Sequence, residues 1–92
     1  MKIEFDPIKS EHNRQTRGLP FDRAIDFDWA GAVFAEDDRN LYTERRFVGV
    51  GYLDNRLHVI CFTHISGGVR IISFRKANSR EAIRYGKAIA LD

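Results

Sequence analysis

Residues 45–76 constrain the fold most strongly, because they contain three runs with a period of two that are separated by two short turn sequences. The runs cover residues 45–52, 56–65 and 69–76, and such a period is typical of strands, whose successive side chains point to opposite faces of a sheet. Asp54-Asn55 and Ser66-Gly67-Gly68 lie between the runs and are typical of hairpin turns. We therefore expect three consecutive antiparallel strands.

The residues before this region predict two helices and two further strands. Residues 2–5 alternate as a short first strand, and Asp6-Pro7 is a typical helix start, since Asp caps backbone N–H groups and Pro fits the first turn. This polar helix is expected to end at Gly18. A second helix is expected over residues 19–31, then a strand over 32–35 and an acidic loop over 36–40.

A closing helix is expected from Ser79 through Ile89. The helices are thus segregated from the strands along the chain, which predicts an α+β fold: an antiparallel sheet with two N-terminal helices and one C-terminal helix. The length of 92 residues predicts a single domain over residues 1–92.

Composition excludes several classes of protein. The chain is 43% hydrophobic and 30% charged, which is typical of a globular domain and not of a disordered tail. No stretch is long and apolar enough for a membrane span, and the N-terminus lacks an apolar signal-peptide core. Cys61 alone cannot form an internal disulfide. We expect a cytoplasmic domain without a cofactor.

Charge is distributed unevenly along the chain. Residues 1–44 carry six basic and ten acidic side chains, a net charge of −4, whereas residues 45–92 carry nine basic and three acidic side chains, a net charge of +6. The asymmetry indicates an anionic partner for the basic half, and nucleic acid is the usual candidate. The alternative is an ordinary solvated surface.

The strongest candidate for chemistry is the basic strand 70–76. Strict alternation would send Arg70, Phe74 and Lys76 to one face, with Ser73 and Arg75 on the other. His64, beside the glycine turn, could act as a general base or acid because its ordinary pKa lies near neutrality. The chain's histidines, at 12, 58 and 64, lack the spacing of metal ligands, so no metal site is expected.

Short motifs occur in a fixed order along nearly the whole chain. They are Phe5-Asp6-Pro7, Lys9, Asn13 and Gly18; Phe21 and Ala24; Val33-Phe34; Glu44 and Arg46; and Arg70-Ile71-Ile72-Ser73, Arg75-Lys76-Ala77, Glu81 and Tyr85. In this order they resemble the BrnT family, the toxins of BrnT/BrnA type II toxin–antitoxin pairs. The chain departs from the family pattern at Thr16-Arg17, where Lys-His is usual, and at Phe74, where Ala is usual.

The resemblance implies a RelE-like fold and a ribonuclease that inhibits translation. It also implies a BrnA-type antitoxin as partner, in a hetero-oligomer that binds operator DNA through the antitoxin. We expect cleavage without a metal, by attack of the RNA 2′-OH on the adjacent phosphorus.

This chemistry needs cations for the phosphoryl oxygens and groups that transfer protons. Arg75, Lys76 and Arg46 are predicted to stabilise the developing charge. His64 and Glu44, and then Tyr85 and Lys9, are the predicted proton-transfer groups. The residues predicted to bind RNA are Lys9, Arg17 and Arg70.

Two functions without catalysis are also compatible with the sequence. The same domain could bind RNA or an antitoxin and act by occlusion, in which case its cations would only contact phosphates. It could also be a structural interaction domain that uses the polar segment 8–17, which predicts no dependence on RNA.

Overall fold

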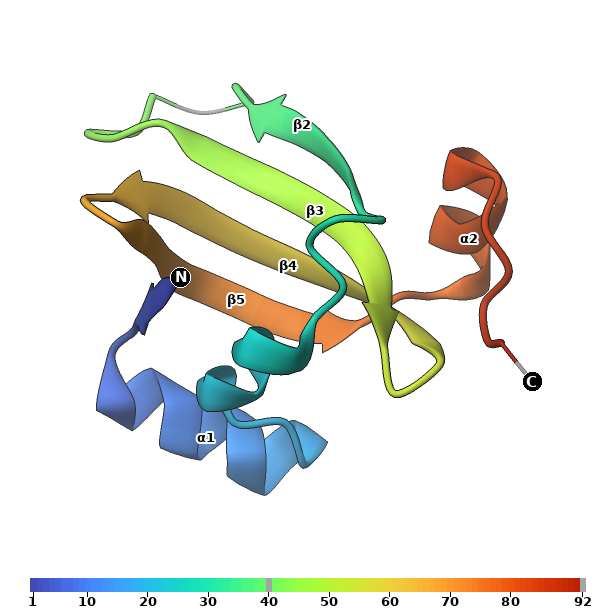
Figure 1. Cartoon of the computed structure of the whole chain (residues 1–92), viewed down its shortest axis with the longest axis horizontal. Helices are drawn as coiled ribbons and strands as arrows, with labels where there is room; N and C mark the ends of the chain where they lie inside the picture. Colours follow the sequence, from blue (N-terminus) through green and yellow to red (C-terminus); the bar gives the residue numbers. More distant parts are fainter. Residues whose placement is uncertain (40, 92) are drawn as a thin grey trace.

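The computed structural model describes residues 1–39 and 41–91, so Asn40 of the predicted acidic loop lies outside it. The elements follow the order β1 (Lys2–Glu4), α1 (Pro7–Arg17), a 3₁₀ helix η1 (Phe21–Asp26), β2 (Val33–Asp37), β3 (Arg46–Leu53), β4 (Arg56–Ile65), β5 (Gly68–Lys76) and α2 (Ser79–Tyr85). In the described residues the strands form one sheet in the order β1-β5-β4-β3-β2 (Figure 1). The predicted α+β fold is confirmed.

Both predicted hairpins are present. Asp54 and Asn55 join β3 to β4 and adopt positive φ angles of 50° and 61°, which Asp and Asn tolerate better than most residues. The strands β2 to β5 pair antiparallel, whereas β1 pairs parallel with β5, a difference from the expected antiparallel sheet. Gly68 permits this last pairing, because a Cβ there would overlap the carbonyl oxygen of Lys2.

The sheet carries a hydrophobic cluster on each face. On one face, η1 and the segments flanking it contribute Leu19, Phe21 and Phe27, which pack with Ile60 and Phe74 of the sheet. On the other face, α2 covers a smaller cluster at one end of the strands, where Ala82 packs with Leu57 and Val59. Figure 1 shows α1 and η1 on the first face, and α2 beyond the end of the sheet.

Two predicted helices are shorter than expected. The second helix is only the six-residue η1, because Phe27 leaves the helical region and the chain turns toward β2. The closing helix ends at Tyr85, where Gly86 caps it in the left-handed conformation. Strand β2 extends to Asp37 and so takes in two residues of the predicted acidic loop.

A β-bulge in β5 changes which side chains share a face. Cys61 pairs with Ser73 but the next residue, Phe62, pairs with Ile71, so Ile72 is an extra residue in the ladder. Ile71 and Phe74 consequently lie in the same hydrophobic cluster, although strict alternation put them on opposite faces. The bulge also places Arg70 and Lys76 on opposite faces, where the sequence predicted a shared one.

Candidate nucleic-acid interface

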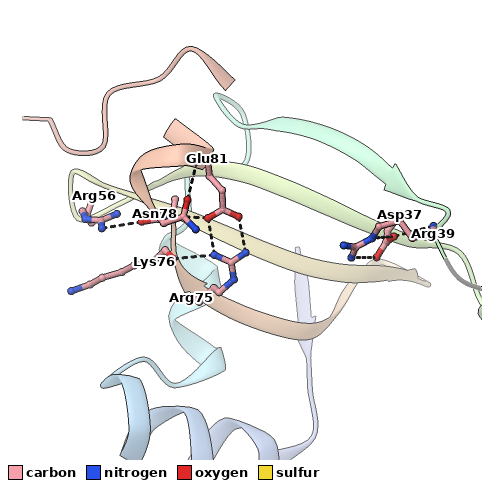
Figure 2. A network of polar contacts seen from close by, with 8 residues as sticks. Asp37, Arg39, Arg56, Arg75, Lys76, Asn78 and Glu81 are labelled. Carbon is pink, nitrogen blue, oxygen red and sulfur yellow. Dashed lines mark hydrogen bonds and ion pairs between the residues drawn. The ribbon is translucent and has the colours of Figure 1, made fainter. Parts of the chain in front are cut away.

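The two cations at the end of β5 point to opposite faces of the sheet. Arg75 reaches the α2 side, where it contacts Glu81, whereas Lys76 lies on the α1 side beside Leu19 and Leu53. Figure 2 shows the Lys76 side chain extending away from the Arg75–Glu81 pair. The structure therefore does not bring these two predicted phosphate ligands into one site.

Arg75 is held in a bidentate ion pair. Its two terminal nitrogens donate to the Glu81 carboxylate at 2.8 and 2.7 Å, and this carboxylate also accepts from the Asn78 backbone N–H at 3.0 Å (Figure 2). The hydrogen bonds from Arg75 lower the pKa of Glu81 to about 2, and the same pair raises the pKa of Arg75. Arg75 therefore links β5 to the first turn of α2, and most of its charge is neutralised.

The hollow around Arg75 is not a basic surface. It has a volume of about 290 Å³ and, among the described residues, is lined by three arginines and four carboxylates: Arg39, Arg75, Arg84, Glu36, Asp37, Asp38 and Glu81. Their formal charges sum to −1. Asp37 and Arg39 form their own ion pair at 2.9 Å, which lowers the pKa of Asp37 to about 2. Tyr85 also lines this hollow.

A larger cleft opens on the other face of the sheet, and we call it the basic cleft. It has a volume of about 530 Å³, and its described lining is Arg17, Gly18, Leu19, Arg23, Leu53, Asp54, Arg56, His58 and Lys76. Four cations against one carboxylate give it a formal charge of +3 with His58 neutral. Arg23 donates to both oxygens of Asp54 at 3.1 and 2.9 Å, so the excess charge lies on Arg17, Arg56 and Lys76.

Three separate elements bring these cations together. Arg17 is the last residue of α1, where a cation is favoured by the negative end of the helix dipole. Arg56 begins β4, and its guanidinium donates to the carbonyls of Leu57 at 2.6 Å and Ala77 at 3.0 Å. Lys76 ends β5. Asn13 ties α1 to β5 by donating to the carbonyls of Leu19 and Phe74 at 2.7 and 2.9 Å.

His58 lies in the wall of the basic cleft, and sequence reasoning missed it as a site residue. It is directly opposite Lys76 in the β4–β5 ladder, only 4% exposed, and its ring packs on Phe74 at 5.5 Å between centroids. Its Nδ1 lies 2.7 Å from the carbonyl oxygen of Arg56. A carbonyl can only accept, so Nδ1 carries the proton and Nε2 keeps its lone pair.

Burial is the main cause that lowers the pKa of His58, and the neighbouring Arg56 and Lys76 charges lower it further. The hydrogen bond to the Arg56 carbonyl and the Asp54 charge oppose this effect. His58 is therefore a neutral imidazole near neutral pH, held in one tautomer beside three cations.

The predicted catalytic residues His64, Arg46 and Glu44 line neither the basic cleft nor the hollow around Arg75. His64 is exposed, contacts Phe47 and Phe62, and lies six residues along β4 from His58, about 20 Å at the usual strand rise. Arg46 stacks on Tyr42 at 4.2 Å, and its Nε lies 3.5 Å from Glu44. That nitrogen is buried and makes no hydrogen bond with any described residue.

The remaining candidates are spread over the surface. Thr43 donates to Glu44 and lowers its pKa, which makes this carboxylate a weaker base. Lys9 is exposed on α1, and Arg70 pairs with Glu4 at 3.1 Å. Of the residues predicted from the sequence, the structure gathers Lys76 and Arg17 into one cleft and separates them from Arg75, Arg46, Glu44, His64, Tyr85, Lys9 and Arg70.

Within residues 1–39 and 41–91, no group of three or more His, Cys, Asp or Glu side chains is arranged to hold a metal ion. No helix in this part of the chain has the length and apolar character that a membrane crossing requires.

The described residues form a small α+β protein with a cleft of formal charge +3 on one face of its sheet. A family model described as the ribonuclease toxin BrnT of type II toxin–antitoxin systems matches residues 5–81. The chain belongs to the BrnT family of ribonuclease toxins, which confirms the resemblance seen in the sequence motifs, and its architecture is consistent with the RelE-like fold. As a type II toxin it has a cognate antitoxin as partner. A search among curated proteins gave no match.

Proposed function

We propose that this toxin cleaves RNA without a metal ion, by attack of a 2′-OH on the adjacent phosphorus, and that the basic cleft holds the scissile phosphate. The products would be a 2′,3′-cyclic phosphate and a 5′-OH. One observation carries the proposal: Arg17, Arg56 and Lys76 converge on one cleft with a formal charge of +3, whereas the hollow around Arg75 has a charge of −1.

The three cations suit the charge that develops during this reaction. The phosphorane carries more negative charge on its non-bridging oxygens than the starting diester, so fixed cations stabilise it more than the substrate. Arg56 is already oriented by two carbonyls, and its remaining N–H groups, which have no hydrogen-bond partner among the described residues, can donate to phosphate oxygens. Lys76 adds a compact charge on a flexible stem.

The alternative location for the same chemistry is the α2 side of the sheet, where the predicted catalytic residues Arg75, Arg46 and Tyr85 lie. A phosphate there would have to compete with the Glu81 carboxylate for both arms of the Arg75 guanidinium. Glu81→Gln distinguishes the two locations. It weakens this competition, so cleavage should rise if Arg75 binds the phosphate and stay unchanged if the basic cleft does.

The test is an RNA cleavage assay with purified protein in excess EDTA, followed by analysis of the product ends. We expect cyclic phosphate ends, and a loss of about 10²–10³-fold in rate for Lys76→Ala and for Arg56→Ala. Lys2→Ala is the matched control, since Lys2 is exposed on the edge strand β1. Full activity in Lys76→Ala and Arg56→Ala would remove the cleft from the proposal.

Binding without cleavage is the competing outcome for free RNA. In that case the domain acts on RNA by occlusion or requires the ribosome, and the cleft variants would weaken affinity only. We also propose that the cognate antitoxin is of the BrnA type and forms a hetero-oligomer with the toxin that binds operator DNA through the antitoxin. Co-expression should relieve growth arrest, and the purified antitoxin should stop RNA cleavage.

A further inference from the structure

We propose that His58 is the catalytic base of the basic cleft, accepting the proton of the attacking 2′-OH at Nε2. The inference rests on the proposed function, which assigns the phosphate ligands of the cleft but no group that accepts the proton. It replaces His64, Glu44, Tyr85 and Lys9, which lie outside the cleft.

The ring of His58 is fixed in one tautomer. The 2.7 Å hydrogen bond from Nδ1–H to the Arg56 carbonyl leaves Nε2 as the nitrogen able to take a proton. Packing against Phe74 and pairing of His58 with Lys76 across the β4–β5 ladder hold the ring at the cleft wall. A base oriented in this way loses little entropy when it meets its substrate.

Most of the charged groups around His58 are cations. Arg56 on β4, Lys76 on β5, Arg17 on α1, and Arg23 with its partner Asp54 are the charged groups that line the cleft with His58. Burial first, and then the charges of Arg56 and Lys76, keep the imidazole neutral before RNA binds, because a further positive charge is unfavourable there. A bound phosphate adds negative charge next to the ring, so the imidazolium becomes more favourable as the reaction begins.

The 2′-OH proton moves to Nε2 while the 2′-oxygen forms a bond to phosphorus, and the bond from phosphorus to the 5′-oxygen breaks. The departing 5′-oxygen takes a proton from water in the open cleft. The hydroxide that remains recovers the proton from His58, which returns the enzyme to its starting state.

The test compares the dependence of kcat/KM on pH for the wild type, His58→Gln and His58→Ala in EDTA. The wild type should lose activity as the pH falls below 6.5, the ordinary value for His, because the lowered pKa places the protonation of the free enzyme there. His58→Gln should cleave about 10²–10⁴-fold more slowly and lack this acid limb. Added imidazole should restore part of the activity of His58→Ala.

Two controls separate the base from a structural role. His12→Gln, which changes an exposed histidine on α1, should leave rate and pH profile unchanged. The His58 variants should still bind an RNA with a 2′-deoxy nucleotide at the cleavage position. If His58→Gln keeps the wild-type rate and acid limb, the assignment of His58 as the base is overturned, whereas cleavage by the wild type still supports the proposed function. If the wild type does not cleave free RNA, the proposed function itself is overturned for free RNA.

If the His58 variants do not fold, NMR of the wild-type protein decides. The Nε2 resonance of His58 should shift, and its pKa should rise, when the 2′-deoxy RNA is added. An unchanged Nε2 resonance in the presence of bound RNA overturns the inference.

Discussion

At the scale of single residues, Arg75 and Lys76 show that neighbours in one basic motif can have different roles. Arg75 is one-third exposed and shares both arms of its guanidinium with Glu81, whose side chain is 22% exposed. Lys76 lies on the opposite face, in a cleft with two other cations that have no carboxylate partner among the described residues. The first side chain stabilises the protein, and the second is available to a ligand.

The Arg75–Glu81 pair should make stability depend on pH in the acid range. The folded protein lowers the pKa of Glu81 from 4.5 to about 2, so the pair contributes fully above about pH 4.5 and the contribution is lost as the pH falls toward 2. Glu81→Gln should lower the free energy of unfolding at pH 7 by about 1–2 kcal/mol. Urea unfolding at several pH values measures this difference, which should shrink on acidification.

Glu36→Gln is the matched control. Glu36 also pairs bidentately with an arginine, Arg45, but the Arg45 side chain is 74% exposed and solvent screens the pair. We expect no measurable change in stability. An equal effect of the two substitutions would show that the Glu81 pair has no special role in anchoring α2.

At the scale of elements, the hairpins could be predicted from sequence because alternation and turn residues are local signals. The bulge could not. A two-residue turn at Ser66-Gly67 with no bulge would pair His58 with Arg75, whereas the extra residue Ile72 shifts the register and pairs His58 with Lys76. The composition of the cleft depends on that shift. It also depends on α1 and β4, which are distant in sequence, so no local sequence pattern indicates that Arg17 and Arg56 lie in one cleft.

Asn13 connects two of these elements and offers a test of the cleft's construction. Its side-chain amide donates to the carbonyls of Leu19 and Phe74, so Asn13→Ala leaves two partly buried acceptors unsatisfied. The substitution should cost about 1–3 kcal/mol in unfolding free energy. It should also weaken RNA binding, because Arg17 follows on the same helix. Thermal unfolding and binding of the 2′-deoxy RNA measure both effects.

His12→Ala is the control for this prediction, since His12 is the exposed neighbour of Asn13 on α1. It should leave both stability and RNA binding close to wild type. A wild-type affinity in Asn13→Ala, together with lower stability, would mean that the position of α1 does not matter for the ligand.

At the scale of the whole molecule, the small net charge of +2 conceals an uneven surface. Paired arginines such as Arg39, Arg45 and Arg75 hold their partners' carboxylates close, whereas the excess positive charge of the basic cleft lies on Arg17, Arg56 and Lys76. Total charge therefore says little about where a polyanion binds. The number of cations without a carboxylate partner in each hollow is the better guide.

The salt dependence of RNA affinity should report these three cations. Each phosphate contact with a single strand changes log K by about 0.7 per decade of salt, so three contacts predict a slope of about −2. Lys76→Ala should reduce the slope by about 0.7, and Arg45→Ala, which removes a paired exposed arginine, should leave it unchanged. Fluorescence anisotropy with the 2′-deoxy RNA over a range of monovalent salt gives both slopes. A steep slope that Lys76→Ala does not alter would locate the phosphate contacts on another surface, because counterion release counts every cation that meets a phosphate and no others.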